Sequence, residues 1–161
     1  MGLETSSKRY AKALIGYGVE KDNLDILFSE FSSLIETLED SEDLVSFIQN
    51  PTISKDIKQK VLDKLISDNL PSTSIVINLL SQNNRLDMLL DVCKGFIKQY
   101  NVHKDIVEVT VTTPIEISED IESSIQAYLN SIENGTIKLL KKKDESLIAG
   151  FTIAVSYTHL T

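Results

Sequence analysis

The chain has 161 residues, which is enough for one ordinary domain or two small ones. Its net charge of -8 argues against a nucleic-acid backbone or an anionic membrane surface as a direct partner. The single cysteine excludes a disulfide or a cysteine zinc cluster within one chain, and no apolar run approaches the roughly 20 residues that cross a bilayer. The N-terminus shows no signal-peptide or transit-peptide pattern, so a soluble protein is expected.

The first 40 residues predict two amphipathic helices. The first begins near Thr5 and runs to about Glu20, and the second opens at Asp22 and carries a regular apolar stripe up to Leu38. Gly16 and Gly18 lie within the first helix, where they indicate either the close approach of another backbone or fraying of the helix end. The first helix has two apolar faces, one with Tyr10, Leu14 and Tyr17, and a flatter one with Ala11, Ile15 and Gly18.

The next helices are shorter. A third helix ends at Asn50-Pro51, since the residue before a proline avoids helical geometry. Ser54 is predicted to cap a fourth helix, in which the apolar residues face inward and the lysines face the solvent. The inward set is Ile57, Val61, Leu62, Leu65 and Ile66, and the outward set is Lys55, Lys58, Lys60 and Lys64.

A longer helical pattern spans residues 73–100 and is interrupted at residues 82–84. Its first part carries the apolar residues Ile75, Val76, Leu79 and Leu80. Its second part carries Cys93 on the apolar face, where a buried and inert thiol is expected. After Tyr100 the period changes to two, and Val107, Val109 and Val111 alternate with polar residues, which is typical of a half-buried strand.

The last third predicts a strand at residues 106–113, a helix capped by Ser118, and further strands at residues 136–140 and 148–155, with a turn at residues 141–144. The inner face of that helix is expected to be Ile121, Ile125, Tyr128, Leu129 and Ile132. The predicted fold is therefore mainly α, with a six-helix bundle in residues 1–104 and a small, incomplete α+β domain in residues 105–161.

Residues with the chemistry of an active site are scarce. His103 and His159 are the only histidines, and neither has a second histidine or a cysteine at metal-ligand spacing. The sequence has no phosphate-binding Gly-Lys-Ser/Thr loop, no paired-glycine dinucleotide turn and no nucleophile elbow. We therefore predict a binding or structural role, with no catalytic residues, no cofactor and no metal.

Three segments together resemble the delta subunit of bacterial F-type ATP synthase, which is similar to the oligomycin-sensitivity-conferring protein of mitochondria. The first is Arg-Tyr-Ala-Lys-Ala-Leu at residues 9–14. The second is Leu79-Leu80 followed by Asn84-Arg85-Leu86 and Phe96, where the family usually has Gly-Arg-Leu at the middle positions. The third is Asp-Glu-Ser-Leu-Ile-Ala-Gly-Phe at residues 144–151, with Ala149 in place of a family glycine. After this segment the family continues through a further strand and a final helix, so we expect a C-terminal truncation and non-native residues at the end.

The resemblance implies a non-catalytic stator subunit on the cytoplasmic face of the bacterial plasma membrane. The N-terminal bundle would bind N-terminal helices of the alpha subunits, and the second domain would bind the distal end of the peripheral-stalk b subunits. The alternative is a soluble helical adaptor that binds another amphipathic helix. Copurification with ATP synthase subunits distinguishes the two.

The expected docking surface is a groove between the first helix and the helix that begins at residue 73. In it Ala11, Ile15 and Gly18 would leave a low strip of small residues. Arg9 and Lys12 would lie at the rim, and Ile75, Val76 and Leu79 would form the other wall. In the second domain, the helix face at Ile121, Ile125 and Tyr128 is expected to stay partly uncovered.

Overall fold

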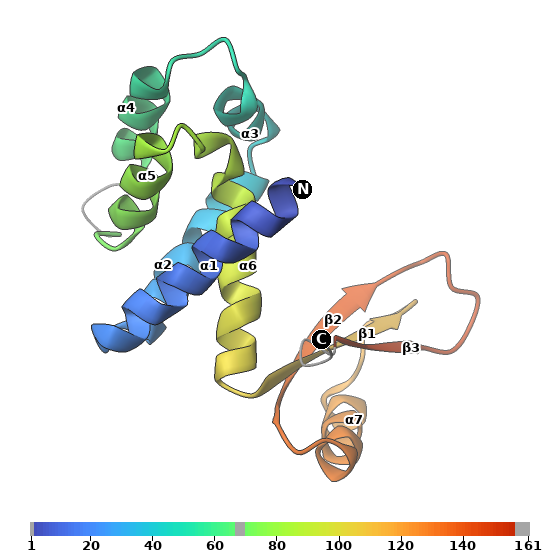
Figure 1. The fold of residues 1–161 in the computed structure, drawn as a ribbon. Helices are drawn as coiled ribbons and strands as arrows, with labels where there is room; N and C mark the ends of the chain where they lie inside the picture. The colour runs from blue at the N-terminus through green and yellow to red at the C-terminus, as the bar shows by residue number, and fades with distance from the viewer. Residues whose placement is uncertain (1, 67–69, 157–161) are drawn as a thin grey trace. The chain divides into compact units, whose positions relative to one another are not determined.

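The computed structural model describes residues 2–66 and 70–156, which form a mainly helical protein with a small three-stranded sheet (Figure 1). This confirms the predicted fold class in outline. The chain divides into two compact units, residues 1–100 and residues 101–161. The division falls within the last helix of the first unit, a few residues before the predicted domain boundary. The predicted truncation and the predicted non-native residues concern the end of the chain, where residues 157–161 lie outside the described residues.

The described residues of unit 1 form helices and the segments that connect them, in the order that the sequence predicts. The helices are α1 (Leu3–Glu20), α2 (Leu24–Glu39), α3 (Glu42–Gln49), α4 (Lys55–Leu65), α5 (Thr73–Gln82), a short 3-10 helix η1 (Leu86–Met88) and α6 (Leu89–His103). In Figure 1, α4 and α5 lie side by side, as their contacts also show. Contacts join the chain neighbours α1 and α2, α2 and α3, and α5 and η1, and they also join α2 to α5 and α3 to η1.

Two helices of unit 1 end in the same way. Asp22 follows α1 and Asn84 follows α5, each with a left-handed φ of 53°. The next residue donates its N–H back to the helix: Asn23 bonds to the carbonyl of Gly18, and Arg85 bonds to that of Leu80. This is the Schellman arrangement, in which glycine or asparagine is favoured at the left-handed position. Asp22 therefore ends α1. The prediction that Asp22 opens the second helix is wrong, because α2 begins at Leu24.

Aromatic side chains join α2 to α6 in the core of unit 1. Phe31 and Phe96 meet edge to face with ring centres 4.8 Å apart, and Phe28 stacks on Tyr100 at 4.2 Å. Both geometries are favourable for aromatic pairs. The Tyr100 hydroxyl donates to Oδ1 of Asp25 at 2.6 Å. Burial and this hydrogen bond raise the pKa of Tyr100 to about 12.

The thiol of Cys93 lies among the buried residues of α6. Burial raises its pKa to about 12, so the thiolate is not populated at neutral pH. The predicted burial of this thiol is confirmed.

A buried carboxylate joins α2 to the start of α5. Glu30 is only 6% exposed, and its Oε2 accepts from the backbone N–H of Thr73 at 2.9 Å and from the Thr73 hydroxyl at 3.3 Å. Ser72, at the cap position of α5, makes no side-chain cap bond. Glu30 therefore supplies from another helix the negative charge and the acceptor that a helix N-terminus requires.

Unit 2 is a small sheet with one helix against it. Its elements are β1 (Ile106–Thr113), α7 (Glu119–Ile132), β2 (Thr136–Lys143) and β3 (Thr152–Ser156). The strand order is β2-β1-β3, with β2 parallel and β3 antiparallel to β1. The three valines of β1 and Leu129 of α7 form the buried core. The predicted inward alternation of β1 is confirmed.

Two boundaries in unit 2 differ from the prediction. The turn expected at residues 141–144 is still strand up to Lys143, because Lys141, Lys142 and Lys143 pair with the last residues of β1. Strand β3 begins at Thr152, so Ile148 lies in the preceding loop and is fully exposed. Lysine-rich composition indicated a turn, whereas pairing with β1 extends the strand to its full length.

Removing the Glu30 carboxylate should weaken unit 1. We expect Glu30→Ala to lower the free energy of unfolding by about 2 kcal/mol, because the N–H and the hydroxyl of Thr73 lose a charged acceptor, and the N–H keeps only its bond to the Leu70 carbonyl at 3.1 Å. The control is Glu36→Ala, an exposed position on the same helix, where the change should stay within about 0.5 kcal/mol. Urea unfolding followed by helical circular dichroism measures both. Equal effects in the two variants would show that the Glu30 contact contributes nothing specific.

The raised pKa of Tyr100 predicts a loss of stability at alkaline pH. The folded-state pKa lies above the unfolded value near 10, so the stabilisation is complete below pH 10 and is lost as the pH rises toward 12. The stability difference between the wild type and Tyr100→Phe should be constant below pH 10. By pH 12 the wild type should have lost about 2 kcal/mol of its free energy of unfolding relative to Tyr100→Phe. Comparing the two proteins cancels the titration of lysines and Cys93, and a difference that is independent of pH would contradict the assignment.

Candidate partner-binding surfaces

The face of α1 that packs into unit 1 is built from small residues and one leucine. Ser7, Ala11, Leu14 and Gly18 are all buried, and they follow the spacing of one helical stripe. Tyr10 and Tyr17, which were expected to face inward with Leu14, are half-buried. The buried face of α1 therefore includes Ala11 and Gly18, and it is rotated about the helix axis away from the predicted inner face with Tyr10 and Tyr17.

These small residues let α1 approach its neighbours closely. A Cβ placed on Gly95 of α6 would lie 3.3 Å from the Cβ of Ala11. A Cβ placed on Gly18 would lie 2.8 Å from a side-chain carbon of Leu24 and 2.9 Å from one of Leu27, both in α2. Gly18 therefore marks close helix packing and not a frayed end, whereas a Cβ placed on Gly16 would have nothing within 4 Å of it. The expected open strip at Ala11 and Gly18 is wrong, because the chain's own helices occupy it.

The accessible part of α1 is the flank that carries Arg9, Lys12 and Ile15. Arg9 and Lys12 are exposed, and Ile15 is half-buried. These three residues from the predicted docking set remain available to a partner.

Helix α5 likewise has one buried face and one accessible flank. Val76, which was predicted to line the docking groove, is completely buried together with Ile77 and Leu80. Ile75 and Leu79, one turn apart, are half-buried. Another flank of α5 is tied to α4, since Gln59 donates to Asn78 and accepts from the Ser81 hydroxyl, both at 2.7 Å. The remaining apolar surface of α5 is therefore at Ile75 and Leu79.

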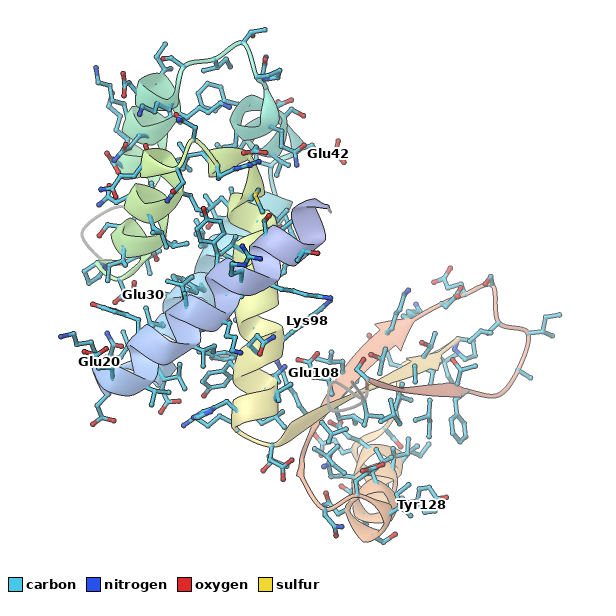
Figure 2. The ribbon with its side chains drawn as sticks, viewed as in Figure 1. Glu20, Glu30, Glu42, Lys98, Glu108 and Tyr128 are labelled. Carbon is cyan, nitrogen blue, oxygen red and sulfur yellow. The ribbon has the colours of Figure 1, made fainter. Side chains whose placement is uncertain are left out.

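Unit 2 has an apolar groove of about 500 Å³ between α7 and the region of β3. Figure 2 shows Tyr128 on α7, where it is 61% exposed. Leu129 alone of the predicted inner face is fully buried, and Ile125 is half-buried. Ile132 is exposed, so its predicted inward position is wrong, whereas the uncovered face at Ile121 and Tyr128 is confirmed. The groove is lined by Asp120, Ile121, Ser124, Ile125, Tyr128, Phe151 and Ile153.

The segment at residues 144–151 forms the loop between β2 and β3. Oδ1 of Asp144 accepts from the backbone N–H of Ser146 at 3.0 Å and from its hydroxyl at 2.6 Å, and these bonds lower the pKa of Asp144. Gly150 has a φ of +86°, a conformation that residues with a Cβ rarely adopt. The Asp-x-Ser and glycine positions thus shape a turn.

The described residues contain no group of three or more His, Cys, Asp or Glu side chains that could hold a metal ion. His103 is exposed at the end of α6, and His159 lies outside the described residues. Among the described helices, none combines the length and apolar character needed to span a membrane.

A family model described as "ATP synthase delta (OSCP) subunit" matches residues 7–160, nearly the whole chain. The chain belongs to this family. It is therefore a non-catalytic subunit of the peripheral stalk of an F-type ATP synthase. The resemblance drawn from residues 9–14, 84–86 and 144–151 is confirmed.

Bacterial relatives named ATP synthase subunit delta support the assignment. The protein of Prochlorococcus marinus subsp. pastoris is 26% identical over 155 residues, which cover 95% of this chain and 86% of the relative. The protein of Natranaerobius thermophilus is 27% identical over 148 residues, which cover 92% of this chain and 83% of the relative. The fold also matches a chain in a cryo-EM structure of the Toxoplasma gondii mitochondrial ATP synthase hexamer. The TM-score is 0.71 at 24% identity, covering 91% of this chain and 83% of that one.

The small core of unit 2 predicts that it is less stable than unit 1. Among its described residues the core has four buried apolar side chains, and several large apolar side chains of α7 and the β3 region are exposed. We expect backbone amides of β1 and β2 to exchange at least about tenfold faster than those of α2 and α6. Hydrogen–deuterium exchange of the full chain, read by mass spectrometry of peptides, measures this. Slower exchange in the sheet than in the helices would contradict it.

Proposed function

We propose that this subunit joins the alpha-beta catalytic head of a bacterial F-type ATP synthase to the b subunits of the peripheral stalk. Such a connection would keep the head from turning with the rotor, so that proton flow drives ATP synthesis. The observation that carries the proposal is that a member of this family has two compact units, each with its own accessible apolar surface. A linker between two partners requires two such surfaces.

Unit 1, acting as a six-helix bundle, would bind the N-terminal helix of an alpha subunit. An amphipathic helix docks by laying its apolar face on apolar residues of the receptor. Ile15 of α1 and the Ile75–Leu79 pair of α5 supply such residues, and all three are half-buried. Arg9 and Lys12 would lie at the edge of the contact, where charges affect the association rate and orientation more than affinity.

Unit 2 would bind the distal end of the b subunits. Its groove carries Ile121, Tyr128 and Phe151 as large exposed apolar side chains, which suit the apolar face of a partner helix. Through these contacts the protein would be held at the cytoplasmic face of the plasma membrane. The bacterial relatives named delta subunits favour this location over an organelle.

Substitutions on the accessible flanks of α1 and α5 test the alpha-subunit contact. We expect Ile15→Asp and Leu79→Asp each to weaken binding of a peptide from the alpha-subunit N-terminus by at least about tenfold, because a charge would be buried in an apolar contact. Calorimetry with the full chain measures the affinity. Gly18 is unsuitable for this test, since any side chain there collides with Leu24 and Leu27.

The matched control is Ile26→Asp on α2, where the native isoleucine is 55% exposed. This variant should bind the peptide as the wild type does. Circular dichroism confirms that all three variants are folded. Unchanged affinity in folded Ile15→Asp and Leu79→Asp would remove these flanks from the interface.

A further inference from the structure

Unit 1 has a hollow of about 640 Å³ that lies outside the flanks proposed above for the alpha-subunit contact. It lies between the segment that joins α3 to α4, the first turn of α4, and the segment that joins α5 to η1. Its lining includes three cations and two carboxylates in a protein whose net charge is -8. The cations are Lys55, Lys58 and Arg85, and the carboxylates are Asp56 and Asp87.

Lys58 is the unusual residue of this hollow. It was expected on the solvated face of its helix, yet it is only 7% exposed, while Ile57 beside it is 53% exposed. No described residue forms a side-chain hydrogen bond or an ion pair with its ammonium group. Its ammonium nitrogen is not among the fully buried side-chain atoms that lack a hydrogen-bond partner, so the nitrogen still reaches solvent and the low exposure of the residue comes mainly from its aliphatic stem. Lys58 therefore presents a cation without a protein partner at the wall of the hollow, where an anion can bind it.

The start of α4 provides further donors to the same hollow. Ser54, at the cap position, makes no side-chain cap bond, and the first backbone bond of the helix is from the N–H of Lys58 to the carbonyl of Ser54, at 3.1 Å. The N–H groups of residues 55–57 come before that bond in the chain, so they have no acceptor within the helix. A helix N-terminus carries partial positive charge and binds phosphate or carboxylate oxygens.

Arg85 lines the hollow from the other side. It follows the left-handed residue Asn84, so the Schellman turn that ends α5 fixes its position. Arg85 is exposed, and no described residue pairs with its guanidinium. Its planar set of N–H donors suits a bidentate contact to an oxyanion.

We propose that this hollow binds a phosphate-bearing small molecule. The phosphate group would be held by Lys58, Arg85 and the first-turn N–H groups of α4. These donors come from two separate segments and can serve the several oxygens of a phosphate at once. The hollow is larger than one phosphate ion, and Pro51, Ile53 and Leu86 offer apolar contact for an organic group. Asp56 and Asp87 offset part of the positive charge, which disfavours a highly charged polyanion.

The test is a titration of the full chain with inorganic phosphate at constant ionic strength, followed by amide chemical shifts. We expect saturable shifts at residues 55–57, with a dissociation constant in the millimolar range. Lys58→Met, which keeps the volume and removes the charge, should weaken binding at least tenfold. Arg85→Gln should weaken it several-fold, and it remains informative if Lys58→Met does not fold.

The control variant is Lys64→Met, an exposed lysine in the last turn of the same helix, which should bind phosphate as the wild type does. The absence of saturation, or equal binding by Lys58→Met, would overturn the site. Acetate that competes as well as phosphate would overturn the phosphate assignment in favour of a carboxylate ligand. Peptide binding by the alpha-subunit test is independent of all these outcomes.

Discussion

The aromatic contacts between α2 and α6 hold together two helices that are far apart in the chain. Phe31 meets Phe96, Phe28 stacks on Tyr100, and Asp25 accepts from the Tyr100 hydroxyl. These pairs combine a large buried apolar area with a defined geometry. Glu30, on the same helix as Phe31, holds the start of α5. Helix α2 therefore determines the positions of both α5 and α6, on which the remaining surfaces of unit 1 depend.

Small residues then determine which surfaces are left for partners. Because Ala11, Gly95 and Gly18 lack bulk, α1 lies close to α6 and α2, and the stripe at Ala11 and Gly18 is used within the chain. What remains accessible is the neighbouring flank with Ile15 and the pair Ile75 and Leu79 on α5. A stator subunit has no reaction to catalyse, so its function depends on such flanks and on the rigidity of the helices that carry them.

The residues of two motifs that carry the family resemblance form backbone turns in this structure. The family's Gly-Arg-Leu corresponds here to Asn84-Arg85-Leu86, and Asn84 has a left-handed φ that glycine and asparagine adopt most readily. The Asp-x-Ser at residues 144–146 forms a hydrogen-bonded turn, and Gly150 has a positive φ. These residues fix backbone turns, which explains how they identify a family without forming an active site.

The sequence by itself determined the class of fold, the order of helices and strands, the extent of β1 and the family. Periodicity and turn residues are local properties, so they can be found in one chain. Only the tertiary structure decided which stripe of α1 is buried, that Lys58 lies inside while Ile57 lies outside, and that β2 continues to Lys143. Adjacent stripes of a helix can be equally apolar, and a small residue fits either a buried or an exposed face. The neighbouring helices and strands make that choice, since they set how closely the backbones approach and which side chains have room to pack.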